Sequence, residues 1–278
     1  MKIKIVADSS CELSEDIKKD MNIEIVPLNL MLEDKHFIDD ENLDIKDYIR
    51  QMNACKTAPK TSAPSPHDFM KSYEGNESVF VVTLSSKLSG TYNSALVAKK
   101  MFLKEVTDKF IHVFDSLSAS IGETLICLKI NELAKSGNNE IEIVDKVTEY
   151  INEMKTFFLL ESLEHLAKAG RLNPIVAKVA SMFSIKPIMG SNDDGTIRLV
   201  EKVRGYKRAF KRMVDVIGEE GTKLEEKVLG IAHCNCPDRA LKFKEEVLKK
   251  YKFKNIVIVE TAGLSSTYAD DGGLIVVF

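Results

Sequence analysis

The sequence predicts an α/β protein, with an N-terminal three-layer α/β/α domain built on a mostly parallel sheet and a smaller C-terminal α+β domain. In the first half, short apolar runs alternate with helical patterns, and this alternation favours a parallel sheet covered by helices. In the second half, the turn Asn-Asp-Asp-Gly at residues 192–195 predicts a β-hairpin, because Asp-Gly tolerates the positive φ angles of tight turns. We place the domains at residues 1–155 and 156–278.

Bulk properties narrow the class of protein. The chain carries 39 basic and 42 acidic side chains, and a net charge of −3 gives no reason to expect nucleic acid. Apolar runs stay short of the roughly 18 residues that span a membrane. The N-terminus turns polar after six residues, too early for a signal peptide, and five cysteines form an odd, sparse set. We therefore expect a soluble protein with reduced thiols in the cytoplasm.

The first half divides into strand–helix units. Strands are expected at residues 3–7, 23–32, 79–82 and 110–114, and helices at 45–52, 66–75, 92–100, 122–135 and 141–154. Ser14 and Ser65 are predicted N-caps, and Pro66 suits the first position of its helix. The segment 56–66, with three prolines and four hydroxyl residues, is predicted to be a loop.

Hydroxyl-rich loops follow three of these strands. They contain Ser9 and Ser10, then Ser85, Ser86, Ser89 and Thr91, then Ser116, Ser118 and Ser120. The carboxyl ends of parallel strands meet at one edge of a sheet, where ligands bind, and a helix N-terminus can hold an anion. Gly90 would let a ligand approach the backbone closely. The alternative is that these serines only cap helices, but their recurrence in three loops favours a polar pocket.

The second half predicts strands at residues 157–160, 185–189, 196–203, 228–232, 255–260 and 274–278, and helices at 162–169, 174–182, from 206 and at 238–251. The basic run 202–212 is typical of a solvated helix face, with docking of an acidic partner surface as the alternative. His233, Cys234 and Cys236 lie together, but no second Cys/His pair has zinc spacing. The absence of a nucleophile elbow, a P-loop and a dinucleotide fingerprint argues against a serine hydrolase and against binding of ATP or NAD.

Short motifs are distributed along the whole chain. They are Val6-Ala7-Asp8-Ser9-Ser10, Thr61-Ser62-Ala63-Pro64-Ser65, Leu88-Ser89-Gly90-Thr91-Tyr92, Asp115-Ser116, Gly170-Arg171 and Lys186-Pro187-Ile188. In this order they resemble the DegV family, whose members are two-domain α/β proteins that bind long-chain fatty acids. Some members carry the fatty acid for a fatty acid kinase, whose partner subunit phosphorylates the bound acid to an acyl phosphate. The resemblance implies a DegV-like fold in which the second domain covers the acyl chain.

The resemblance also implies the residues that bind the ligand's head group. Thr61 and Ser89 occupy the positions whose hydroxyls bind the fatty acid's carboxylate. Ser62, Gly90 and Thr91 belong to the same two motifs and are included among the expected ligand-binding residues.

Further positions concern the partner and a departure from the family. By resemblance, Arg171 matches an arginine needed for phosphoryl transfer, and Arg204 matches one expected to face the kinase. Tyr268 stands where the family typically has a histidine, and a tyrosine can donate a hydrogen bond without becoming a cation. We expect Tyr268 to line the site, and Asp270 and Asp271 to repel a carboxylate unless they point away.

These observations predict a non-enzymatic carrier of a palmitate-like long-chain fatty acid, with no other cofactor and no metal. Apolar segments 157–160 and 175–183 are candidates for lining its tail. The expected partner is a fatty acid kinase subunit resembling dihydroxyacetone kinase, and transient contact with a membrane surface is compatible with this role. The alternatives are an enzyme that acts on a small phosphorylated or carboxylated metabolite through the same loops, and an interaction protein without a ligand.

Overall fold

The computed structural model describes residues 2–173, 176 and 184–278. Its first sheet is four-stranded and parallel, in the order β2-β1-β6-β7. The strands are β1 (Ile3–Asp8), β2 (Ile23–Val26), β6 (Ser78–Thr83) and β7 (Ile111–Asp115). The sheet is covered by helices on both faces, which explains why its strands are almost continuously apolar. The predicted parallel α/β/α architecture is confirmed.

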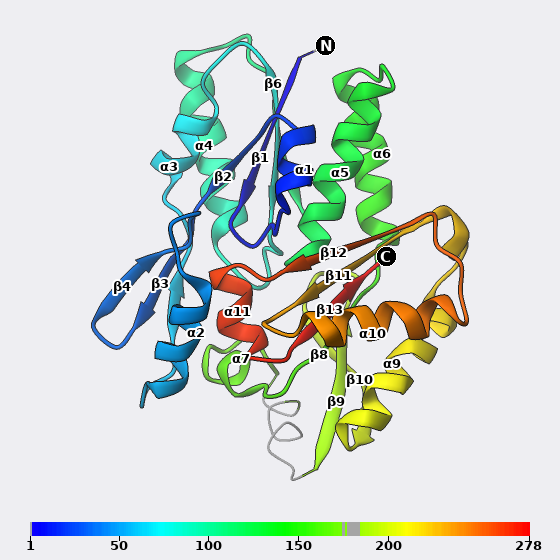
Figure 1. The fold of residues 1–278 in the computed structure, drawn as a ribbon. Coiled ribbons are helices and arrows are strands. Elements are labelled where there is room, and N and C mark those ends of the chain that lie inside the picture. Colours follow the sequence, from blue (N-terminus) through cyan, green and yellow to red (C-terminus); the bar gives the residue numbers. More distant parts are fainter. Residues whose placement is uncertain (1, 174–175, 177–183) are drawn as a thin grey trace.

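The two faces of this sheet pack against different helices (Figure 1). These are α1 (Glu15–Asp20), α3 (Pro66–Ser72), α4 (Thr91–Glu105), α5 (Ile121–Lys135) and α6 (Glu140–Glu153). Ile5 belongs to the core cluster that contains buried residues of α5 and α6, whereas its neighbour Val6 packs with α3 and α4. This alternation follows from the two-residue period of a strand. The predicted N-caps Ser14 and Ser65 are both present, and Ser65 forms a capping box with Asp68.

A small antiparallel sheet, in the order β4-β3-β5, lies beside the first. Its strands are β3 (Asn29–Leu32), β4 (Lys35–Ile38) and β5 (Lys60–Ser62), and α2 (Ile45–Ala54) connects the last two. The prediction that 56–66 is entirely loop is therefore wrong, because β5 lies within it. This short segment is a strand because Thr61 pairs with Leu30 of β3. The composition of residues 56–66 alone does not indicate this partner.

The second sheet is six-stranded and mixed, in the order β10-β9-β8-β13-β11-β12. Its strands are β8 (Thr156–Leu159), β9 (Ile185–Ser191), β10 (Ile197–Arg204), β11 (Val228–His233), β12 (Asn255–Glu260) and β13 (Leu274–Val277). The hairpin predicted at 192–195 joins β9 to β10, and Gly195 has φ +82°. The predicted helix at 174–182 lies outside the described residues apart from residue 176.

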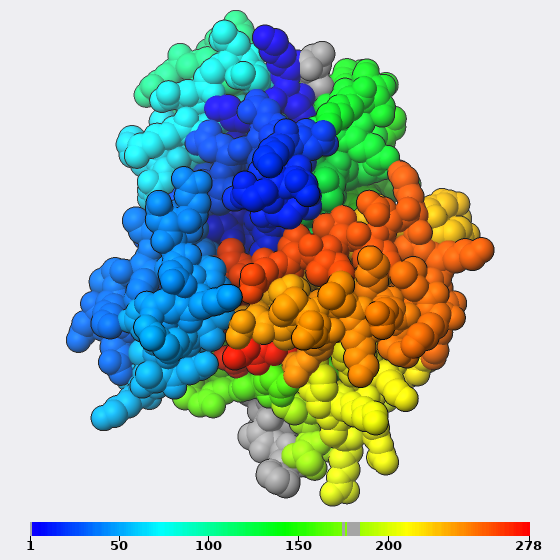
Figure 2. All heavy atoms as spheres, in the orientation of Figure 1, coloured from blue at the N-terminus to red at the C-terminus, as the bar shows by residue number. Residues whose placement is uncertain are grey.

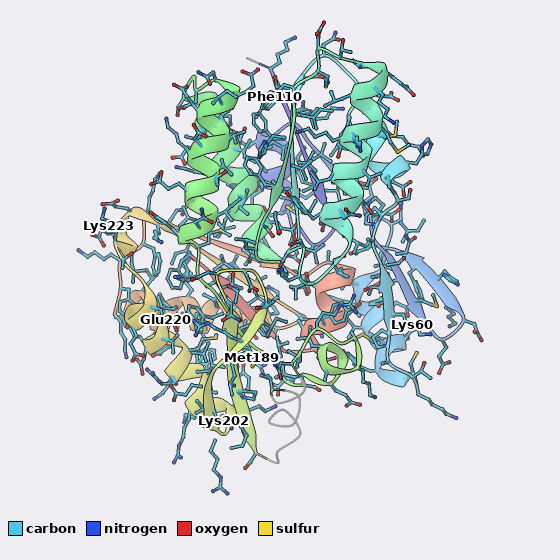
Figure 3. All side chains as sticks on the ribbon, turned by 180° about the vertical axis from the view of Figure 1, so that it is seen from behind. Lys60, Phe110, Met189, Lys202, Glu220 and Lys223 are labelled. Atoms are coloured by element: carbon cyan, nitrogen blue, oxygen red, sulfur yellow. The ribbon has the colours of Figure 1, made fainter. Side chains whose placement is uncertain are left out.

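The helices of this half are α7 (Glu164–Lys168), α9 (Tyr206–Glu220), α10 (Pro237–Leu248) and α11 (Gly263–Ala269), with a 3₁₀ turn at Leu224–Glu226. Helices α9 and α10 cover one face of the second sheet. On α9, the buried face contains Phe210 and Met213, and Lys207 and Arg208 are exposed. Lys202 also lies at the periphery (Figure 3). Most of the basic side chains in the run 202–212 are therefore exposed, which fits both a solvated helix face and a docking surface.

One hydrophobic core connects the two large sheets. Helix α5 is buried along Ile121–Cys127 and packs against β1 and β6 of the first sheet and against β11 and β13 of the second. The same core cluster contains Ile5 and Phe80 from one sheet and Ala232 and Val277 from the other. In Figure 2 the blue surface of β3, β4 and α2 lies directly against the orange and red surface of the C-terminal third.

Candidate functional site

A cavity lies where the carboxyl ends of β1, β6 and β7 meet the second sheet and α11. About 120 Å³ of it is open to the centre of a water molecule, roughly ten times the space that one water requires. Most of its wall is hydrocarbon, contributed by Leu28, Leu84, Leu88, Leu117, Ala119, Phe158, Leu160, Leu166, Ile197, Leu264, Ala269 and Ile275. Such a wall suits an apolar ligand, and the size excludes a site built for a single ion or water.

Polar side chains also line this cavity, and several of them contact one another. The hydroxyl oxygens of Thr61 and Tyr268 lie 2.8 Å apart, joining β5 to α11. Ser89 also lines the cavity, and its Oγ accepts a hydrogen bond of 3.3 Å from the backbone amide of Thr91. Among the described residues, Arg171 is the one charged side chain in the cavity wall. In Figure 3, α11 lies between the labelled residues Met189 of β9 and Lys60 of β5.

Arg171 is oriented by contacts on three sides. Its Nε donates to the carbonyl oxygen of Leu88 at 3.0 Å, and one terminal nitrogen donates to Ala169 at 2.7 Å. Its Cζ lies 5.9 Å from the centroid of the Tyr268 ring, within cation–π range. A guanidinium held in this way presents a fixed positive charge to a ligand's anionic group.

The structure separates the expected site residues into two groups. Thr61, Ser89, Arg171 and Tyr268 line the cavity. Ser62 is exposed, because successive residues of a strand point to opposite faces.

The other three expected residues lie outside the cavity wall. Gly90 is exposed at the N-cap of α4, and Thr91 is buried with its hydroxyl 2.8 Å from that of Ser89, so it supports Ser89. Arg204 is exposed at the end of β10.

In the described chain, only Ser89 of the loop after β6 bonds an amide at the start of α4, that of Thr91, so capping does not account for Ser85. The N-cap of α4 is Gly90, which has no side chain to accept a bond. Ser85 instead donates to the carbonyl oxygen of Gly195 at 2.9 Å and accepts from the amide of Lys87 at 3.2 Å. It therefore shapes the loop and ties it to the hairpin of the second sheet.

The acidic residues after Tyr268 point away from the cavity. Oδ1 of Asp270 lies 2.9 Å from Nδ1 of His165, and Asp271 accepts from Asn235 at 3.1 Å. Both aspartates line a separate surface groove. The repulsion that the sequence suggested between them and an anionic head group is thereby reduced.

Local sequence reasoning missed several residues of the wall. Thr156 lies 2.8 Å from Ser118, hydroxyl to hydroxyl, across the two halves. Leu264 and Ser265 come from α11, a helix that the sequence did not predict. Of the expected tail-lining segments, 157–160 supplies Phe158 and Leu160 by strand alternation. Segment 175–183 lies outside the described residues apart from residue 176.

Buried carboxyl groups lie behind the serines of the wall. Ser120 lines the cavity and donates to Glu12 Oε2 at 2.7 Å. Burial raises the pKa of Glu12 to about 8 and that of Asp8 to about 7. Burial, and then the proximity of Asp8, raise the pKa of Glu123, whose carboxyl oxygens have no hydrogen-bond partner in the described chain. Below their raised pKa values these carboxyls are neutral and add no negative charge behind the serines.

The side chains of His233 and Cys236 form hydrogen bonds with nearby backbone groups. Nδ1 of His233 accepts from the amide of Cys236 at 3.4 Å, and the Cys236 thiol lies 3.6 Å from the Gly273 carbonyl oxygen. Within residues 2–173, 176 and 184–278, no cluster of His, Cys, Asp or Glu is arranged to hold a metal ion. The same residues include no helix long and apolar enough to cross a bilayer.

The whole chain is similar in sequence to a known protein family. A family model described as "Uncharacterised protein, DegV family" matches residues 2–278. This chain belongs to the DegV family. A DegV domain-containing protein of Streptococcus gordonii is 37% identical over 274 residues, covering 98% of this chain and 97% of that protein.

Solved DegV structures share the whole fold. A DegV family protein of Ruminococcus gnavus, whose structure includes vaccenic acid, is 41% identical with a TM-score of 0.95, and 99% of each chain is covered. The fatty acid kinase (Fak) B3 protein of Streptococcus pneumoniae, loaded with linoleic acid, is 32% identical with a TM-score of 0.93. That match covers 100% of this chain and 99% of the other.

Proposed function

We propose that this chain is a cytoplasmic carrier that binds a long-chain fatty acid in the cavity between its sheets. The observation that carries the proposal is the distribution of chemistry in the cavity wall. Among the described residues, hydrocarbon side chains make up most of the wall. Arg171, its single charged group, lies over the ring of Tyr268, whose hydroxyl contacts that of Thr61. A molecule with a long apolar chain and one terminal negative charge matches both features.

Magnitudes favour the same class of ligand. Burying about 14 CH₂ groups at roughly 0.8 kcal/mol each gains on the order of 11 kcal/mol before the costs of association. Those costs are about 4–15 kcal/mol, so hydrocarbon burial supplies the affinity and the polar end supplies the orientation. In this arrangement Thr61, Ser89 and Tyr268 hydrogen-bond to the carboxylate, and Arg171 pairs with its charge, which keeps a buried anion from being unpaired.

Relatives support the proposal. The structures from Ruminococcus gnavus and Streptococcus pneumoniae hold vaccenic and linoleic acid, and each aligns with this chain over essentially its full length. A small phosphorylated or carboxylated metabolite, the alternative substrate class, would leave most of the apolar wall without a partner.

A second part of the proposal is that the carrier presents its ligand to a kinase subunit for acyl phosphate formation. The similarity to a fatty acid kinase B3 protein supports this role. Arg204 is exposed at the end of β10 and is accessible to a partner protein. Arg171 lies in the cavity wall beside Tyr268, where it would neutralise charge developed during phosphoryl transfer.

The first experiment is mass spectrometry of the organic extract of the purified protein. We expect a long-chain acid at close to one equivalent, and an empty protein that also fails to take up added palmitate would overturn the proposal. Ser89→Ala and Thr61→Val should each lower retention of the acid. The matched control is Ser86→Ala, an exposed serine in the same loop as Ser89 that lies outside the cavity wall.

A further inference from the structure

Helix α11 brings Tyr268 to the cavity, and its last turn is held from the outside by α7. Nδ1 of His165 lies 2.9 Å from Oδ1 of Asp270 and 3.0 Å from the carbonyl oxygen of Thr267. These two acceptors flank Tyr268 in the chain. The Asp270 carboxylate and the Thr267 carbonyl oxygen are acceptors, so Nδ1 must carry a proton and is the donor whether His165 is neutral or charged.

Asp270 holds an unusual backbone conformation, with φ 55° and ψ 165°. Residues with a side chain rarely adopt this region, and it persists only where surrounding contacts hold it. The side chains of His165 and Asp270 are only 20% and 14% exposed, so their pairing is partly shielded from water. The strained turn immediately after Tyr268 is therefore held by the imidazole.

The turn at Asp270 is one of several contacts that position the end of α11. Thr267 Oγ1 lies 2.7 Å from the hydroxyl of Tyr48 on α2. Tyr268 itself is held by the hydroxyl contact with Thr61 and by the guanidinium of Arg171 over its ring. A change in the turn at Asp270 would thus move the Tyr268 hydroxyl relative to the other polar groups of the cavity wall.

We propose that His165 and Asp270 are positioning residues for the ligand's head group, and that their charged pairing makes fatty-acid binding tighter at mildly acidic pH than at alkaline pH. This inference rests on the proposed fatty-acid site. Neither residue touches the ligand, and both act through Tyr268.

The surroundings of His165 determine the sign of the effect. The charged groups that face it are Glu164 and Lys168 on α7, Glu161 before that helix, Lys56 after α2, and Asp270 and Asp271 after α11. The hydrogen bond with Asp270 raises the pKa of His165, against the lowering effect of burial. A raised histidine pKa means that the charged pair is present at low pH and is lost as the pH rises through that pKa.

The test measures the dissociation constant of a conjugated-polyene fatty acid, which becomes fluorescent on leaving water, at about pH 6 and about pH 8.5. For the wild-type chain we expect binding that is about threefold to tenfold tighter at the lower pH, the range of a partly shielded ion pair. His165→Asn places an amide nitrogen near the position of Nδ1 but cannot become charged. It should retain binding, and its pH dependence should be smaller than that of the wild type.

Two further variants separate this effect from general electrostatics. Asp270→Asn removes the charge of the acceptor and should flatten the profile as well. Glu225→Gln removes an exposed carboxylate from the 3₁₀ turn at Leu224–Glu226, outside the groove that contains His165, and should leave the profile unchanged. Titration of His165 by NMR in the Asp270→Asn chain should show a lower pKa than in the wild type.

The outcomes distinguish the two proposals. A wild-type chain that binds no fatty acid at either pH overturns the proposed function, and this inference with it. A wild-type chain that binds with the same pH profile as His165→Asn and Asp270→Asn leaves the fatty-acid site intact and overturns the positioning role alone. Circular dichroism of each variant at both pH values shows whether an observed loss of binding is a loss of folding.

Discussion

The carboxylate of Asp39 accepts a hydrogen bond of 2.8 Å from the backbone amide of Leu264, 225 residues later in the chain. The same side chain accepts from the amide of Gly263 at 2.7 Å and from the hydroxyl of Ser9 at 2.8 Å. It thereby satisfies the first amides of α11, which have no partner within the helix. One buried residue of the N-terminal half thus fixes the helix that carries Tyr268.

Replacing Asp39 by Ala should destabilise the fold. The change leaves the amides of Gly263 and Leu264 buried without an acceptor, which lowers the free energy of unfolding by about 2–4 kcal/mol. Urea denaturation followed by circular dichroism measures this. Asp34→Ala, in the exposed turn between β3 and β4, is the control and should change stability by less than about 0.5 kcal/mol. Equal stability of the two variants would show that Asp39 does not anchor α11.

The hairpin tip offers a test of close packing between the halves. Gly195 has φ +82°, and a Cβ there would lie 2.4 Å from Ser85 Oγ and 3.0 Å from the Cα of Leu117. The Gly195→Ala side chain would therefore meet two penalties, a strained backbone at positive φ and a steric clash with Ser85 and Leu117. Gly137 has φ +84° with nothing described within 4 Å of such a Cβ, so Gly137→Ala carries the backbone strain alone. We expect Gly195→Ala to cost about 1–3 kcal/mol more in urea denaturation. A difference near zero would mean that the hairpin moves freely away from the loop.

The buried carboxyls predict an unusual dependence of stability on pH. The pKa of Glu12 rises from 4.5 to about 8 on folding, so between these values the folded chain holds a proton that the unfolded chain has released. The contribution of Glu12 to the free energy of unfolding therefore falls as the pH rises from 4.5 to about 8. Below and above this range, this contribution does not change with pH. Glu12→Gln should make the slope less steep by up to about 1.4 kcal/mol per pH unit. Denaturation curves at several pH values test this, with the exposed Glu15→Gln as control; an unchanged slope in Glu12→Gln would contradict it.

Arg171 should discriminate between acids and uncharged ligands. Comparing palmitic acid with the alcohol of the same chain length isolates the contribution of the carboxylate. In Arg171→Gln the preference for the acid should fall by about 10-fold to 100-fold, because a charge-assisted hydrogen bond is replaced by a neutral one. Arg208→Gln, on the exposed face of α9, should keep the wild-type preference. A variant at Arg171 that still prefers the acid by the wild-type ratio would place the head group elsewhere.

The sequence predicts best where structure is determined locally. The parallel sheet follows from continuous apolar strands, and the capping box of Ser65 and Asp68 follows from a four-residue pattern. The sequence does not predict strand β5 and helix α11, because contacts with residues far away in the sequence stabilise them. Thr61 of β5 pairs with Leu30, and the amide of Leu264 in α11 donates to Asp39. In neither segment are apolar residues spaced with the period of a strand or a helix, so the sequence pattern alone does not predict the element.

The same limit applies to the site. Reasoning from loops and helix N-termini finds Ser89, and the family resemblance adds Thr61, Arg171 and Tyr268. Thr156 could not be predicted as a site residue, because its contact with Ser118 of the other half is not visible in any local sequence pattern.

The burial of α5 between both sheets has a consequence for how a ligand enters and leaves. Separating the sheets would expose Ile121, Leu125 and Ile126 to water at once, a free-energy cost comparable to that of global unfolding. We therefore expect the two halves to unfold together as one cooperative unit rather than to separate about a hinge. Exchange of the proposed ligand would then be a local event at the rim of the cavity, on the timescale of loop and short-helix motion.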